Sequence, residues 1–462
     1  MKKLKHDLGL RLVKLLNVIL MTLPFAACWF CYYAQRVYVP YHQMGNWMII
    51  GLFVLLYVIF ARIYDAFYVS LSRISEMIYS QALAFLMSDC IMFVVFWLLI
   101  RSFPALWPGL LALAAQLLLS ALWSFLAHKW YFKSFPPKRS AIICDRDYGI
   151  QGLVHDYGLQ KKFYVCKVLD SQSCIDDLTQ LEDVGAVFVS GVSSHARNII
   201  LKYCITNNID TYLLPRVGDI IMSGAKKMHM FHLPMLRVNR CNPKPEAQIL
   251  KRLFDIISSA IVLLAVSPIM LITAIAIKVS DGGPVFYKQN RLTRNGKVFQ
   301  VLKFRSMRVD AEKNGVARLS SGDKDDRITP VGRVIRKLRI DELPQLLNIL
   351  GGSMSVVGPR PERPEIAEQY EKELPEFSLR LQVKAGLTGY AQVYGKYNTT
   401  PYDKLQMDLM YIANPSFIED LKIIFATIKI IFLPESTEGV AEGQTTAMAE
   451  EKEEREPVQA AK

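Results

Sequence analysis

Two adjacent carboxylates, Asp341 and Glu342, are the residues whose position in the chain best suits chemistry on phosphate. They stand between a basic stretch and an apolar one with helical character. A carboxylate in such a place can attack phosphorus, or can hold a metal ion that bridges phosphate groups. Acidic residues also stabilise free amides at the first turn of many helices, so the pair alone does not decide between catalysis and helix capping.

A single guanidinium follows at Arg360, in the turn formed by residues 358–361, Gly-Pro-Arg-Pro. Arginine grips phosphate with a fork of donors, and the flanking prolines stiffen the turn. Residues 278–340 contain sixteen Lys or Arg and six Asp or Glu. This excess of positive charge favours the binding of phosphate or anionic lipid. Within them, residues 331–338 alternate apolar and basic side chains at helical spacing, which predicts an interfacial amphipathic helix or, alternatively, a solvated helix face.

The elements that must position these side chains include an apolar run over residues 255–277. Basic residues flank it on both sides, whereas a membrane-spanning helix normally carries this excess on one side. Ser267 and Pro268 interrupt its middle, where proline removes a backbone donor and the hydroxyl can satisfy a freed carbonyl. We predict a re-entrant, kinked hairpin over residues 253–279; the alternative is a fifth span with a proline kink.

Upstream, four apolar runs of membrane-spanning length cover residues 12–33, 47–67, 82–100 and 105–127. Hydrophobic residues make up 52% of the 462 residues and the mean hydropathy is +0.20, which is too apolar for an ordinary soluble chain. The basic flanks place both ends of this bundle in the cytoplasm. We therefore predict a four-helix transmembrane bundle over residues 1–136.

Residues 137–240 show short β-rich runs that alternate with helical stretches, a pattern typical of a small α/β unit with a parallel sheet. A dinucleotide-binding turn needs several glycines, but residues 144–149, after the first strand, contain one. We predict a Rossmann-like module with a structural or regulatory role. Although the net charge is +13, residues 435–462 are rich in Glu and predict a disordered acidic tail.

Eight ordered motifs in the second half of the chain resemble the bacterial sugar transferases that act as polyprenyl-phosphate phosphoglycosyl transferases. The resemblance covers roughly residues 252–432, and the upstream spans with an α/β module are similar to the large, polytopic branch of that family. The motifs occupy residues 251–255, 267–268, 283–286, 303–307, 326–329, 341–346, 358–361 and 386–393.

The resemblance implies an α/β-type monotopic catalytic domain over residues 241–434, carried on the cytoplasmic face of a bacterial inner membrane. It implies transfer of a sugar 1-phosphate from a UDP-sugar to undecaprenyl phosphate, with release of UMP and a covalent aspartyl-phosphosugar intermediate. Such a reaction initiates exopolysaccharide, capsule or O-antigen synthesis. We expect the membrane but no nucleic acid as a partner, and the layout is compatible with a homodimer.

By the same resemblance, Asp341 is the nucleophile and the contact for Mg²⁺, Glu342 is its assisting acid or base, and Arg360 clamps phosphate. Near the mouth of the hairpin, we expect Asp255 to pair with Arg252 or a neighbouring cation. The other basic residues expected to add positive field around the phosphates are Arg339, Lys303 and Arg305.

Three other functions fit parts of the chain. A nucleotide-sugar dehydratase with a membrane anchor shares the layout but needs the glycine-rich turn that is missing here. A glycosyltransferase could use residues 323–325, Asp-Lys-Asp, as a metal motif. A membrane scaffold suits the first 240 residues but leaves Asp341, Glu342 and Arg360 unexplained.

Overall fold

The computed structural model describes residues 2–39, 43–145, 150–156, 158–241, 243–308, 327–395 and 399–431. The Asp-Lys-Asp motif at 323–325 and the tail at 435–462 lie outside these residues. The chain divides into two compact units, Met1–Pro215 and Arg216–Lys462, which are described in turn.

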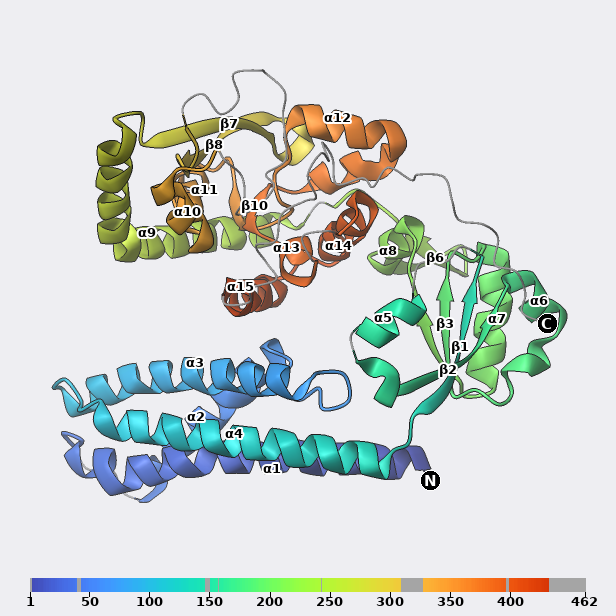
Figure 1. Cartoon of the computed structure of the whole chain (residues 1–462), viewed down its shortest axis with the longest axis horizontal. Helices are drawn as coiled ribbons and strands as arrows, with labels where there is room; N and C mark the ends of the chain where they lie inside the picture. The colour runs from blue at the N-terminus through green and yellow to red at the C-terminus, as the bar shows by residue number, and fades with distance from the viewer. Residues whose placement is uncertain are drawn as a thin grey trace. The chain divides into compact units, whose positions relative to one another are not determined.

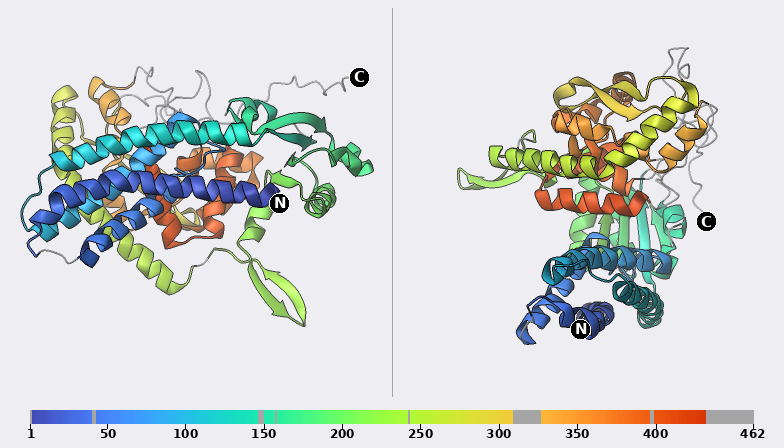
Figure 2. Two further views of the ribbon diagram at one scale, coloured as in Figure 1. Left: turned by 90° about the horizontal axis from the view of Figure 1, so that it is seen from below. Right: turned by 90° about the vertical axis from the view of Figure 1, so that its left-hand side faces the viewer.

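Four long apolar helices open the first unit and run side by side in Figures 1 and 2. Each is long and apolar enough to cross a membrane, which confirms the predicted set of four. A short π-helical and 3₁₀ extension, Trp29–Arg36, continues the first of them. The helices are α1 (Lys2–Cys28), α2 (Gln43–Ile63), α3 (Ile74–Ile100) and α4 (Trp107–Ser134).

A buried polar network joins these four helices, with one side chain from each. The Asn17 amide nitrogen donates to Gln81 Oε1 (3.1 Å), and Tyr57 donates to Asn17 Oδ1 (2.6 Å). Ser120 Oγ also donates to Gln81 Oε1, at 2.8 Å. Since apolar surface gains little by leaving lipid, such bonds fix how membrane helices pack.

A four-stranded parallel sheet completes the first unit, as predicted, with strand order β2-β1-β3-β4. Its core is built from aliphatic side chains such as Ile143, Val187 and Ile200, all fully buried. The strands are β1 (Lys138–Cys144), β2 (Phe163–Leu169), β3 (Ala186–Ser190) and β4 (Asp210–Leu213), and the α-helices between them are α5 (Ile150–Asp156), α6 (Ser171–Asp176) and α7 (Ser194–Thr206).

The second unit begins with a short helix, α8 (Val217–Ser223), and an antiparallel hairpin of β5 (Lys226–Met230) and β6 (Leu233–Arg237). α8 packs into the core of this unit, where Val217 and Ile220 join residues of the later helices. The remaining α-helices and strands are α9 (Pro245–Asp281), β7 (Phe286–Leu292), β8 (Val298–Phe304), α10 (Pro330–Lys337), α11 (Gln345–Leu350), β9 (Ser355–Val357), α12 (Pro364–Glu373), β10 (Gly386–Thr388), α13 (Tyr390–Tyr394), α14 (Pro401–Ala413) and α15 (Phe417–Ile431).

The long apolar helix α9 runs as one helix over Pro245–Asp281 but is bent, as Figures 1 and 2 show. Pro268 lies inside it and cannot donate to the carbonyl of Leu264, four residues earlier. Ser267 Oγ donates to that carbonyl instead, at 2.8 Å. The helix therefore bends without leaving this carbonyl unpaired, and it is long and apolar enough to be a fifth candidate span.

The first turns of α9 are fastened to the rest of the unit by charged side chains. Asp255 is buried and accepts hydrogen bonds from Ser355 Oγ (3.1 Å) and the Val356 amide (3.0 Å). Arg252 instead donates to the carbonyls of Ile349 (2.6 Å) and Leu350 (2.7 Å), at the end of α11. Of the two expected partners of Asp255, Arg252 is therefore wrong, because the two residues bind different elements; pairing with another neighbouring cation stays a prediction.

Candidate active site

The paired carboxylates lie on a 3₁₀ turn, Ile340–Glu342, between α10 and α11. Arg339 adopts a left-handed backbone conformation (φ 57°) and ends α10, so that the chain changes direction just before Asp341. A non-glycine residue in this region is uncommon and carries strain of about 1–3 kcal/mol. The turn places Asp341 inside the unit, with a relative exposure of 9%.

Glu342 is held between two cations. Its Oε1 atom lies 2.9 Å from Lys303 Nζ, at the end of β8, and 3.0 Å from Arg360 Nη2. Burial alone would raise the pKa of Glu342, but the positive charges of Lys303 and Arg360 lower it well below its usual range. Glu342 therefore stays ionised and fixes the orientation of both cations.

Asp341 differs from its neighbour. Burial raises the pKa of its carboxyl, and the Glu342 charge adds to this rise, while Lys303 opposes it. Within the described chain, no side chain forms an ion pair or hydrogen bond with its oxygens. One carboxylate of the pair is thus neutralised by cations, and the other is left for a ligand.

The turn that carries Arg360 is locked by a close crossing of two glycine motifs. The Gly358 amide donates to the Thr388 carbonyl, and the Gly386 amide donates to the Pro359 carbonyl, both at 2.9 Å. A Cβ on Gly386 would lie 2.1 Å from the Gly358 nitrogen, and one on Gly389 would lie 2.1 Å from the Gly358 oxygen. Only glycine fits at this crossing, which explains why the 358–361 and 386–393 motifs occur together.

A buried ion-pair network, which sequence reasoning missed, supports the same turn from behind. Arg380 Nη2 lies 2.7 Å from Asp408 Oδ2 and donates to the Arg360 carbonyl at 3.0 Å. Arg291 Nη1 donates to the Pro361 carbonyl, also at 3.0 Å. Asp408 could have been noticed as an acid among the apolar residues in the second half of α14, but nothing in the spacing links it to Arg380.

The sequence-predicted residues therefore meet in part. Lys303, Glu342 and Arg360 are in direct contact, and Arg339 and Asp341 adjoin them in the chain. Arg305 is buried against Gly283: a Cβ on that glycine would lie 2.4 Å from its Nη1 atom. Its backbone amide donates to the Val285 carbonyl at 3.0 Å, so this arginine joins β8 to the segment after α9.

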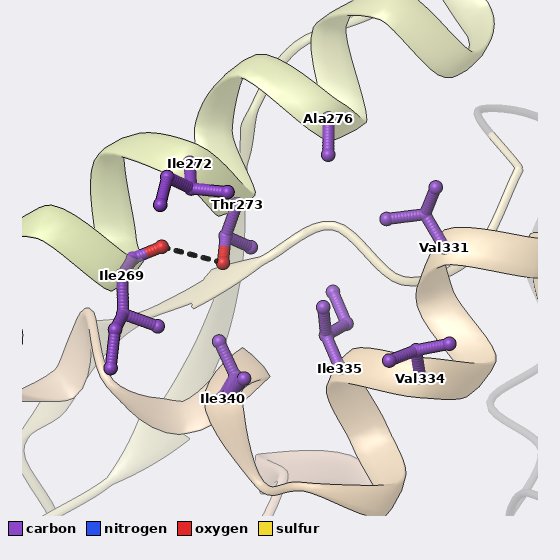
Figure 3. Close-up of a pocket in the computed structure, with 8 residues that line it drawn as sticks. All are labelled: Ile269, Ile272, Thr273, Ala276, Val331, Val334, Ile335 and Ile340. Atoms are coloured by element: carbon purple, nitrogen blue, oxygen red, sulfur yellow. Dashed lines mark hydrogen bonds between the residues drawn. The ribbon is translucent and has the colours of Figure 1, made fainter.

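An apolar groove of about 360 Å³ opens beside the carboxylate turn, between the second half of α9 and α10 (Figure 3). Its one polar group, Thr273 Oγ1, donates to the Ile269 carbonyl at 2.8 Å. Ile340, the residue before Asp341, is part of its lining. Its lining residues are Ile269, Ile272, Thr273, Ala276, Val331, Val334, Ile335 and Ile340.

The chain resembles known proteins, and its family match lies within this second unit. Residues 246–434 match the family model described as "Bacterial sugar transferase". Over 271 residues the chain is 35% identical to an Aeromonas hydrophila UDP-N-acetylgalactosamine-undecaprenyl-phosphate N-acetylgalactosaminephosphotransferase, covering 56% of this chain and 63% of that protein.

Two further relatives agree with this match. An Escherichia coli K12 UDP-glucose:undecaprenyl-phosphate glucose-1-phosphate transferase is 38% identical over 212 residues, 45% of this chain and 44% of that protein. The exopolysaccharide production protein PSS of Rhizobium leguminosarum bv. phaseoli is 42% identical over 189 residues, 39% of this chain and 94% of its own length. The chain thus spans about half the length of the first two relatives and nearly all of the third.

Proposed function

The chain belongs to the bacterial sugar transferase family, and we propose that it transfers a sugar 1-phosphate from a UDP-sugar to undecaprenyl phosphate. The products are UMP and an undecaprenyl-diphosphate-sugar, the starting lipid for exopolysaccharide, capsule or O-antigen synthesis. The observation that carries the proposal is the pair of unlike carboxylates: Glu342 is bound by two cations, and its neighbour Asp341 is not.

In the first step, a carboxylate oxygen of Asp341 attacks the phosphorus that carries the sugar. The bond from this phosphorus to the oxygen shared with the nucleotide phosphate breaks, and UMP leaves with the bonding electrons. The sugar phosphate is then held on Asp341 as an acyl phosphate. In the second step, a phosphate oxygen of undecaprenyl phosphate attacks the same phosphorus and releases Asp341.

Lys303 and Arg360 supply the positive field for both steps, and Glu342 orients them. The lowered pKa of Glu342 suits this orienting role, or that of a base, better than the role of an acid. Arg339 adds positive charge near Asp341. In this proposal, Arg305 keeps β8 in place instead of meeting the phosphates.

Mg²⁺ fits this site as an ion shared with the substrate. Among the described residues, no cluster of three potential ligands would hold a metal by itself. Magnesium commonly binds through one or two carboxylates together with substrate phosphates, and Asp341 can provide such a carboxylate. When bound, the ion would neutralise negative charge on the diphosphate.

The apolar groove supports the proposed acceptor. Undecaprenyl phosphate must bring a charged phosphate to Asp341 while its chain stays in an apolar environment, and Ile340, which lines the groove, precedes this carboxylate in the chain. Exposed apolar residues along α9, such as Leu264 and Leu271, suit contact with lipid. We place α9 as a re-entrant helix in the cytoplasmic leaflet of the inner membrane, which keeps the site at the headgroup level.

UMP release by purified protein tests this function, with undecaprenyl phosphate, Mg²⁺ and a panel of UDP-glucose, UDP-galactose and UDP-N-acetylgalactosamine. We expect release with at least one sugar, and loss of release in Asp341→Asn. Mass spectrometry of the enzyme treated with donor alone should find the sugar phosphate on Asp341. Glu373→Gln, an exposed carboxylate of α12, is the matched control and should remain active. Substantial UMP release by Asp341→Asn would rule out this nucleophile.

A further inference from the structure

Lys404, in the first turn of α14, is a cation of this unit that the mechanism above does not use. It precedes Asp408 by four residues, so the two side chains project from the same face of the helix. Asp408 contacts Arg380, which holds the Arg360 carbonyl. This face of α14 therefore looks toward the turn that carries Arg360.

The acids near Lys404 are already paired with other cations. Asp408 lies 2.7 Å from Arg380, and the two oxygens of Glu362 lie 3.5 Å from Arg380 Nη1 and 3.9 Å from Arg291 Nη1. In the part of the chain that the structure describes, no carboxylate forms an ion pair with the Lys404 ammonium group. Two arginines balance the two acids, and Lys404 adds an extra positive charge.

The pKa of Lys404 reflects burial and the charges of these neighbouring groups. Burial lowers the pKa of Lys404, and the guanidinium groups of Arg380 and Arg360 lower it further, against the opposing effect of the two acids. Of the Arg360 guanidinium nitrogens, Nη2 binds Glu342, whereas Nε and Nη1 have no partner among the described residues. Lys404 therefore has an ammonium group without a carboxylate partner, and Arg360 has two guanidinium nitrogens without a partner, among the residues that the structure describes.

We propose that Lys404 and Arg360 together bind the donor phosphate nearer to the uridine, the phosphate that leaves as part of UMP. The inference rests on the proposed function. Glu342 binds the Arg360 guanidinium group, and Asp341 is its neighbour in the chain. Lys404 shares a helix face with Asp408, whose partner Arg380 donates to the Arg360 carbonyl. In this proposal the phosphate that Asp341 attacks lies on the Nη2 side of the Arg360 guanidinium group, and the leaving phosphate binds the remaining guanidinium nitrogens together with Lys404.

The chemistry of the leaving group favours this assignment. When the bond between the two phosphates breaks, negative charge grows on the oxygen that stays with UMP. An ammonium group that loses solvation on burial gains more from such an anion than an exposed one does. Lys404 is therefore a binding residue for nucleotide, and it has no role toward the lipid acceptor.

Steady-state kinetics of Lys404→Met and Lys404→Arg test the proposal, with Lys372→Met as the matched control on the exposed face of α12. We expect Lys404→Met to raise both the KM for the UDP-sugar and the inhibition constant of added UMP by about 10- to 100-fold, typical for the loss of a hydrogen bond to a charged group. Lys404→Arg should recover most of this loss. The KM for undecaprenyl phosphate and the thermal unfolding midpoint should not change.

Unchanged UMP inhibition in Lys404→Met would overturn the proposal, as would an equal effect in Lys372→Met. A rise in the KM of both substrates together would also overturn it, because this pattern indicates a general structural defect. If the wild-type protein releases no UMP from any donor, the proposed function itself fails. Wild-type turnover with no shift in Lys404→Met refutes the Lys404 assignment alone.

Discussion

Replacing Arg380 by methionine should both destabilise the second unit and weaken catalysis. Arg380 and Asp408 are 4% and 1% exposed, and their closest nitrogen and oxygen atoms are 2.7 Å apart. Removing one partner of such a pair leaves a buried charge without compensation, at a cost of about 3–5 kcal/mol. At about 2–4 °C for each kcal/mol, the unfolding midpoint should fall by about 6–20 °C.

A second variant separates stability from positioning. In Arg380→Met/Asp408→Leu both buried charges are absent, so much of the lost stability should return. Glu362 is about 20% exposed and can keep solvent as a partner. The Arg360 carbonyl still lacks its donor in this double variant, so turnover should remain low even though the protein is stable.

Thermal unfolding in lipid nanodiscs, followed by intrinsic fluorescence, gives the midpoints, and UMP release by the same samples gives the activity. A shift below about 2 °C in Arg380→Met, which corresponds to less than 1 kcal/mol, would contradict the energetic reasoning. Full activity in the double variant would show that the hydrogen bond to Arg360 does not position the turn.

Three further predictions concern the glycine crossing, the bent helix and the cations. Gly389→Ala should lower the free energy of unfolding by about 1–3 kcal/mol, because the new Cβ clashes with the Gly358 carbonyl oxygen. Gly218→Ala is the control, since a Cβ there meets open space. Equal unfolding midpoints of the two variants in thermal scans would argue against the clash. Pro268→Ala should straighten α9 and so move Lys278 relative to the membrane. A cysteine introduced at Lys278 should then react with an impermeant maleimide from a different side of membrane vesicles than it does without Pro268→Ala. Labelling from the same side in both proteins would count against the re-entrant helix. Lys303→Met should lower kcat/KM for UMP release by about 10- to 100-fold, with partial recovery in Lys303→Arg, and near-normal turnover would remove this lysine from the site.

The sequence predicts those parts of this protein that depend on local pattern. Runs of apolar residues identify the four helices, and short β-rich runs identify the parallel sheet, because period and length are properties of each segment. The freed carbonyl beside Pro268 was also predictable, since a proline always removes the same hydrogen bond. Each helix or strand of this protein is therefore predicted largely from its own residues.

Contacts between distant segments were not predictable in this way. Arg252 and Asp255 are close on one helix and suggested an ion pair, yet both bind backbone groups about 100 residues away in the chain. Arg380 and Asp408 meet because α14 packs beside the 3₁₀ segment Pro375–Gln382, which carries Arg380. Motif spacing identifies the residues that react, whereas the residues that hold them depend on tertiary packing.

The polar network of the first unit has a consequence for how the protein is made. Asn17, Tyr57, Gln81 and Ser120 come from four helices that enter the membrane one after another during synthesis. Until the fourth helix is inserted, the side-chain oxygen of Gln81 lacks its Ser120 donor, and a polar group with too few partners is unfavourable in lipid. Assembly of the bundle is then complete only after the last span has been inserted. A chain truncated before α4 should be cleared by membrane proteases faster than the full bundle, and equal half-lives in a pulse-chase experiment would argue against this order of assembly.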